Sequence, residues 1–202
     1  MFGNSTRSFA LACAGWVMVG CTEPEVDLAA PADHLPSFAA KPGDPGAASD
    51  RILYQVRLGA LGDSRSHGVV LIEVVGGHLA VSAHAAGLEP LQHIPQHIHL
   101  NPTCDPGGGI LLNLDANLTV AGEGPGVGTA YPVANAGGVV NYYASRSLSD
   151  LLQAVNTHLG LGLTSVEALL AWLDLDNRNA HMHVAFGPPF PAVNCGEIER
   201  LN

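Results

Sequence analysis

The stretch GVVLIEVVGGHLAVSAHA, residues 68–85, contains two runs of strand-forming side chains separated by Gly76-Gly77. The first run is rich in β-branched residues, and the second follows directly after the glycine pair. This pattern is typical of a β-hairpin, because paired glycines adopt the positive φ angles that tight hairpin turns require. Just upstream, residues 52–58 alternate apolar and polar side chains, which predicts a preceding strand.

Short strand-like segments continue along the chain, separated by glycine-rich turns. The chain has 24 glycines and 14 prolines, far too many for a helical bundle. The further expected strands are residues 97–100, 111–120, 128–133, 138–143 and 181–183. Together these segments predict an all-β domain, a β-sandwich or barrel of about eight strands.

One segment, near residues 147–175, has a helical period instead. Apolar residues recur at helical spacing between Leu148 and Leu159, which predicts a first short helix. Thr164 and Glu167 form a capping-box pattern, which predicts a second helix beginning there. We expect this helical insertion to cover one end of the sandwich.

Length and charge limit the functional classes. The 202 residues allow one domain of ordinary size plus export and linker segments. The formal net charge is -10, and the only lysine is Lys41. No cluster of lysine and arginine could neutralise a row of phosphates, so nucleic acid is not expected as a partner.

The amino-terminal residues predict export to the cell envelope. Residues 1–20 contain no acidic residue and one apolar stretch that is too short to span a bilayer, which is typical of a signal peptide. The sequence Met-Val-Gly-Cys ending at Cys21 is similar to a bacterial lipobox, so we expect Cys21 to be lipidated and to anchor the protein in a membrane. An ordinary signal peptide cleaved nearby is the alternative. Residues 21–50 are rich in Pro, Ala and Gly and predict a tether, leaving residues 51–202 as the folded domain.

The cysteine count agrees with export. Cys13 leaves with the signal peptide and Cys21 would carry the lipid, which leaves Cys104 and Cys195. In an oxidising compartment these two are expected to form a disulfide.

Two pairs of alternating histidines are the candidate metal ligands. His97 and His99 lie in one expected strand, and His181 and His183 lie in another. Alternate residues of a strand face the same side, so both pairs could converge on one ion. Imidazole nitrogens suit copper or zinc better than calcium or magnesium. The alternative is a solvated polar face of a sheet.

The run HIHLNPTC, residues 97–104, resembles the copper-ligand strand and following cysteine of bacterial copper/zinc superoxide dismutases. Residues 195–198, Cys-Gly-Glu-Ile, resemble the last strand of that family, and the resemblance covers roughly residues 51–201. It implies a Greek-key β fold and a pairing of the two cysteines. The chain is also similar to CHRD-type domains of secreted proteins, which share the His-Ile-His strand and a Gly-Glu-Ile turn.

The dismutase resemblance assigns individual residues. It implies that His97 and His99 are the first two copper ligands and that His183 is the ligand contributed near the end of the chain. His181 has no counterpart in the family and stands as a candidate substitute fourth ligand.

The chain also departs from the dismutase pattern. Residues 105–113 lack the histidines that hold zinc in the family, and Asp115 is one position away from the expected aspartate, so zinc is not expected. Ala192 replaces the arginine that guides superoxide. The sequence therefore predicts a copper-binding lipoprotein, with weak superoxide dismutation or copper sequestration, and leaves a metal-free CHRD-like binding or structural module as the alternative.

Overall fold

The computed structural model describes most of the predicted β domain. The described residues are 51–104, 109–123, 131–183 and 192–202, without the side chain of His183. All of them belong to one compact unit, Leu35–Asn202. The predicted signal peptide, lipidation site and tether lie outside the described residues.

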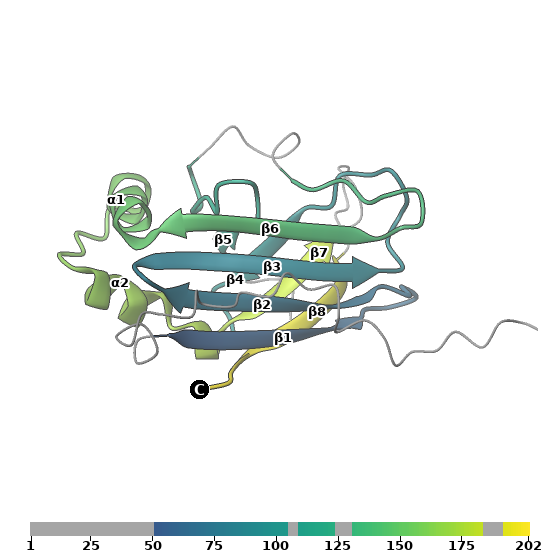
Figure 1. Ribbon diagram of the computed structural model, residues 1–202, viewed down its shortest axis with the longest axis horizontal. Coiled ribbons are helices and arrows are strands. Elements are labelled where there is room, and N and C mark those ends of the chain that lie inside the picture. The colour runs from purple at the N-terminus through teal and green to yellow at the C-terminus, as the bar shows by residue number, and fades with distance from the viewer. Residues whose placement is uncertain (1–50, 105–108, 124–130, 184–191) are drawn as a thin grey trace, which may run out of the picture. The chain divides into compact units, whose positions relative to one another are not determined.

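The domain is built around one antiparallel sheet of eight strands. The strands are β1 (Ile52–Ala60), β2 (His67–Val75), β3 (His78–Ala86), β4 (Gln96–His99), β5 (Ile110–Asn113), β6 (Val140–Ser147), β7 (Asn179–His183) and β8 (Ala192–Arg200). Their order in the sheet is β5-β4-β7-β8-β1-β2-β3-β6. Figure 1 shows that the sheet curls, so that β4, β5 and β7 lie behind the layer formed by β1, β2, β3 and β6. The all-β prediction is confirmed. Strands β1, β2 and β3 pair in sequence order, and β8 returns from the end of the chain to lie beside β1, which is the Greek-key type of connection.

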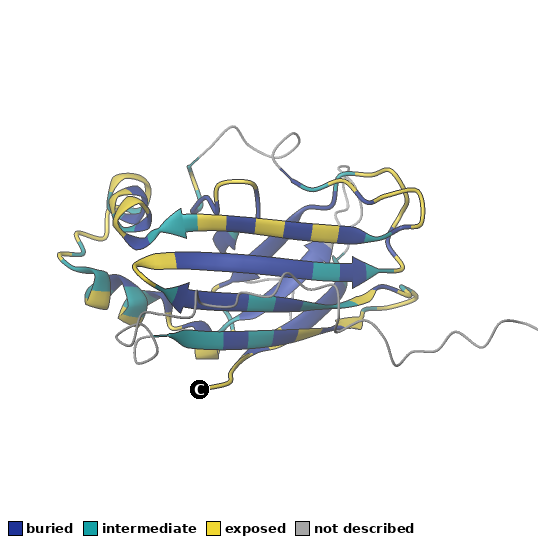
Figure 2. Cartoon of the chain, in the orientation of Figure 1, coloured by how far each residue is buried: buried dark blue, intermediate teal, exposed yellow. Residues whose placement is uncertain are grey.

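Apolar side chains from both layers form the core. Val56, Ile72 and Val81 in the front layer and Ile98 and Met182 in the back layer are all at most 1% exposed. Burying each such side chain stabilises the fold by about 1.5–3 kcal/mol. In Figure 2, β6 alternates between buried and exposed residues, as a strand with one face on a core should.

The glycine pair predicted to turn the first hairpin does so. Gly76 and Gly77 have φ angles of 54° and 75°, and they connect Val75 to its partner His78. Positive φ at both central residues is the requirement of the commonest two-residue hairpin turn, which explains why glycine occupies both positions.

Two short helices and one 3-10 turn follow β6, as expected from the helical period. Helix α1 (Leu148–Leu159) begins at the N-cap Ser147, helix α2 (Val166–Leu173) begins at Ser165, and η1 spans Leu175–Asn177. The predicted cap at Thr164 is wrong by one residue, because the Ser165 hydroxyl accepts the backbone N–H of Ala168 instead. The helices lie at one end of the sheet (Figure 1). Within the described residues, none of the helices is both long and apolar enough to cross a bilayer.

The strand expected over residues 111–120 is shorter than predicted. Strand β5 ends at Asn113, and the chain then turns and returns to Leu112 only through a single bridge at Val120. The cause is Asp115, whose carboxylate accepts the backbone N–H groups of Asn117 and Thr119 and so stabilises a turn in place of a ladder. The expected strand at residues 128–133 is described only from residue 131, where it forms an isolated bridge between Val133 and His93.

Candidate metal centre

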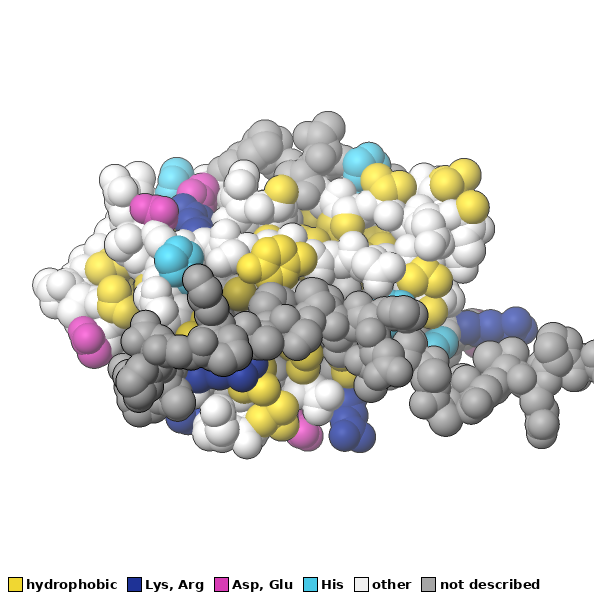
Figure 3. All heavy atoms as spheres, in the orientation of Figure 1, with side chains coloured by type: hydrophobic (Ala, Val, Ile, Leu, Met, Phe, Trp, Pro, Cys, Tyr) yellow, Lys and Arg dark blue, Asp and Glu magenta, His cyan; other side chains and the backbone are white. Residues whose placement is uncertain are grey.

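Three buried histidines from two neighbouring strands form a compact cluster. His97 and His99 come from β4 and His181 from β7, and each offers a ring nitrogen within 4.8 Å of the others. Their exposed fractions are 7%, 5% and 3%. Elsewhere, histidine side chains appear at separate places on the surface in Figure 3. The cluster therefore differs from a solvated polar face, which was the alternative interpretation of these residues.

The register of four strands places this cluster. His97 lies directly opposite Asn113 of β5 on one side and His181 of β7 on the other, and His181 in turn lies opposite Cys195 of β8. Directly opposed residues of an antiparallel pair point to the same face. Asn113, His97, His181 and Cys195 thus form one row across the sheet.

The row lies on the face of the sheet that points away from the core. Ile98, Ala180 and Met182, which alternate with the histidines along β4 and β7, belong to the core cluster. Strand alternation then places the histidines on the opposite face. His99 completes the cluster from this face, with its ring centroid 4.0 Å from that of His181.

The structure brings His181, the candidate substitute fourth ligand, to His97 and His99. The ligand role that the resemblance implied for His183 stays a prediction. The pairing of β7 with β8 shifts in register between Met182 and His183. The side chain of His183 lies outside the described part of the structure.

The donor set fits a metal ion that prefers nitrogen. Imidazole nitrogens bind zinc or copper at about 2.0–2.1 Å, so two nitrogens on one tetrahedral ion lie roughly 3.3 Å apart. The three nitrogens lie within 4.8 Å of one another, so small side-chain rotations bring them to that spacing. The ligands come from two hydrogen-bonded strands, which limits the reorganisation that binding requires.

Tyr131 contacts the cluster and was missed by the sequence analysis. Its hydroxyl lies 2.9 Å from Nε2 of His97 and donates to Oδ1 of Asn113 at 2.8 Å. The segment that carries Tyr131 runs beside the chain just before β4, where the backbone N–H of Ile94 donates to the Pro132 carbonyl. His93 lies there with Nδ1 3.2 Å from the Tyr131 carbonyl. No histidine or cysteine motif marks residue 131, so spacing alone could not find it.

Burial and charge keep the Tyr131 hydroxyl protonated. Desolvation raises the pKa of Tyr131 well above its ordinary value, and the negative charge of Asp115 raises it further. Tyr142, which donates to the backbone carbonyl of Asp115, has its pKa raised mainly by burial as well. Both tyrosines therefore act as neutral hydrogen-bonding groups at physiological pH.

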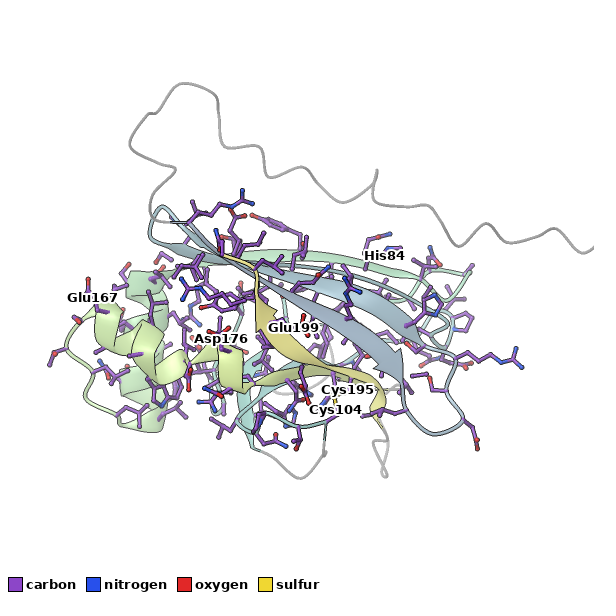
Figure 4. All side chains as sticks on the ribbon, turned by 90° about the horizontal axis from the view of Figure 1, so that it is seen from below. His84, Cys104, Glu167, Asp176, Cys195 and Glu199 are labelled. Carbon is purple, nitrogen blue, oxygen red and sulfur yellow. A yellow bond between two sulfur atoms is a disulfide. The ribbon has the colours of Figure 1, made fainter. Side chains whose placement is uncertain are left out.

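The chain after β4 is fastened beside the histidines. The side-chain amide of Asn179 donates to the backbone carbonyls of Asn101 and Thr103 at 2.8 and 2.7 Å. The predicted disulfide between Cys104 and Cys195 is confirmed, with the two Cα atoms 5.7 Å apart, and Figure 4 shows the two labelled residues together next to β8. These contacts hold the segment that follows His99 against β7 and β8. The following residues 105–108, where the dismutase family has zinc ligands, lie outside the described residues.

The functional interpretation of this chain rests on the geometry of the three-histidine cluster and not on a sequence match. No protein-family model matches the sequence, and no curated protein matches it significantly. What the structure shows is an all-β domain with three buried histidines close enough to hold a metal ion.

Each histidine of the cluster should be required for metal binding. We expect His97→Ala, His99→Ala and His181→Ala to weaken metal affinity by more than about 100-fold, beyond what loss of an outer partner costs. Chelator competition measures the affinity, and circular dichroism checks the fold. His78→Ala is the matched control, since His78 is exposed on the first hairpin.

The variant His183→Ala tests whether His183 is a ligand, as the family resemblance implies. Tight binding in His183→Ala together with loss in His181→Ala is the expected result. Loss of affinity in His183→Ala with unchanged affinity in His181→Ala would contradict the cluster and support the assignment taken from the family resemblance.

The disulfide should contribute strongly to stability. Because the bond closes a loop with a sequence separation of 91, we expect Cys104→Ala with Cys195→Ala to lower the free energy of unfolding by about 4 kcal/mol. Urea unfolding measures the change, and chemically reduced wild-type protein is the control that should lose a similar amount. A loss below about 1 kcal/mol in both would show that the unfolded chain is already restricted.

Proposed function

We propose that this protein is an exported, lipid-anchored copper-binding protein whose β domain holds the metal through His97, His99 and His181. One observation carries the proposal: three imidazoles from β4 and β7 converge on the outer face of the sheet and are nevertheless buried. Burying three polar rings at one place costs free energy unless they gain strong partners, and a metal ion supplies one partner to all three.

The ligand chemistry favours copper. The cluster of described residues consists of three imidazoles and contains no carboxylate, so the hard oxygen-seeking ions calcium and magnesium bind it poorly. Among the divalent ions that accept imidazole, copper binds a given nitrogen site more tightly than zinc. The resemblance of residues 97–104 to the copper strand of dismutases supports the same choice.

Copper would supply one-electron chemistry at this site. Dismutation oxidises one superoxide to dioxygen and reduces another, with two protons, to hydrogen peroxide. The net charge of -10 repels superoxide, and Ala192 stands where the dismutase family has its guiding arginine. We therefore propose copper sequestration as the main role and superoxide dismutation as a slow side activity.

Copper content tests this function directly. Full-length protein, extracted from envelopes in detergent and offered equimolar copper and zinc, should retain one copper per chain by elemental analysis. Copper(II) paramagnetic resonance should show nitrogen ligands, and His181→Ala should lose both signals while His78→Ala keeps them. Background copper in folded wild-type protein would overturn the proposal and leave the CHRD-like, metal-free module as the better account.

Anchoring is tested separately from the metal. Cys21→Ser should move the protein from the membrane to the soluble fraction and abolish incorporation of radiolabelled fatty acid, because the thiol that would carry the lipid is gone. Cys13→Ser is the matched control, since that cysteine lies inside the predicted signal peptide. Labelling that persists in Cys21→Ser would refute lipidation at this residue.

A further inference from the structure

We propose that a directed chain of hydrogen bonds from Asp115 through Thr119, Asn113 and Tyr131 fixes the tautomer of His97, so that Nε2 carries the proton and Nδ1 carries the lone pair. The tautomer follows from the described contacts alone. Its consequence, that Nδ1 is the atom through which His97 binds a metal, rests on the proposed function. Tyr131, Asn113, Thr119 and Asp115 are then positioning residues for the metal site.

The direction of the chain is set at Asp115. A carboxylate only accepts hydrogen bonds. Oδ1 of Asp115 accepts the backbone N–H groups of Asn117 and Thr119, and Oδ2 accepts the Thr119 hydroxyl at 2.5 Å. The single proton of the Thr119 hydroxyl is therefore used toward Asp115, and toward its other neighbour this oxygen acts as an acceptor.

The Asn113 side chain continues the chain of hydrogen bonds in the same donor-to-acceptor direction. Its amide nitrogen donates to the Thr119 hydroxyl at 3.0 Å and to the Thr119 backbone carbonyl at 3.4 Å. A backbone carbonyl cannot donate, so the amide nitrogen, and not Oδ1, must face Thr119. Oδ1 of Asn113 consequently faces the other way, toward Tyr131.

Tyr131 extends this directed chain of hydrogen bonds to His97. Its hydroxyl donates its one proton to Oδ1 of Asn113, so its oxygen can only accept from Nε2 of His97. The two rings meet edge-on, with centroids 5.6 Å apart. His97 in its neutral form is then protonated on Nε2 and presents the lone pair of Nδ1.

The fixed tautomer matters because an imidazole that is free to adopt either tautomer binds a metal less tightly. A neutral imidazole binds a metal through whichever nitrogen lacks the proton, and the hydrogen bond at the other nitrogen sets which one that is. Binding through Nε2 would require breaking the Tyr131 contact, whereas binding through Nδ1 retains it. Residues that orient a ligand in this way are typically worth 10–100-fold in metal affinity.

Nitrogen-15 NMR of the metal-free, full-length protein at mildly alkaline pH tests the tautomer without any metal. We expect the His97 ring to be protonated on Nε2 with slow exchange of that proton. Tyr131→Phe should allow a mixture of tautomers and fast exchange, and Thr119→Val should give a smaller change. Tyr142→Phe is the matched control, because it removes a buried hydroxyl that donates to the backbone carbonyl of Asp115.

Copper affinity by chelator competition tests the consequence in the same variants. Tyr131→Phe and Thr119→Val should bind about 10–100-fold more weakly, while Tyr142→Phe stays within about threefold of wild type. A His97 ring protonated on Nδ1 in the wild type, or NMR and affinity unchanged in Tyr131→Phe, would overturn the inference. Wild-type protein that binds no copper but shows the Nε2 proton, lost in Tyr131→Phe, would refute the proposed function and support the tautomer.

Discussion

The register of β4 between β5 and β7 is the constraint on which the rest of the site depends. It places Asn113, His97, His181 and Cys195 in one row across four strands. Because side chains alternate along a strand, a slip of one residue would send His97 and His99 into the core and Ile98 out of it. Core packing and ligand geometry therefore select the same register, so the hydrophobic core acts as the positioning device for a polar site on the other face of the sheet.

Several contacts outside the ladder reinforce this register. Cys195 belongs to the row and is bonded to Cys104, which follows β4 by five residues. Asn179, opposite His99, holds the backbone of the same segment through its side-chain amide. Strand β4 has only four residues, and so short a strand has little ladder of its own to resist slippage. The disulfide and the Asn179 hydrogen bonds at its end supply that resistance.

Local patterns were sufficient to predict most of the fold. Alternation and β-branched runs predicted β1 to β3, and the helical period predicted both helices, because these signals come from residues close in sequence. The pattern failed at residues 111–120, where the turn made by Asp115 prevailed over strand propensity. It also missed the cap by one residue, since Thr164 and Ser165 are equally suitable by type and only the backbone geometry decides between them.

The sequence predicted which residue types form the candidate site. It did not predict which histidines lie together or which residues hydrogen-bond to them. His-x-His spacing identified two candidate pairs, yet the approach of His181 to His97 and His99 depends on the register between strands more than 75 residues apart. Tyr131 and Asp115 carry no metal motif, because hydrogen-bonding partners are selected by position and not by residue pattern. Among the described residues, His97 is supported by a chain of side-chain hydrogen bonds that ends on a carboxylate. That chain makes Asp115, set aside by a sequence comparison for being one position from its expected place, the residue from which the polarity of the site is determined.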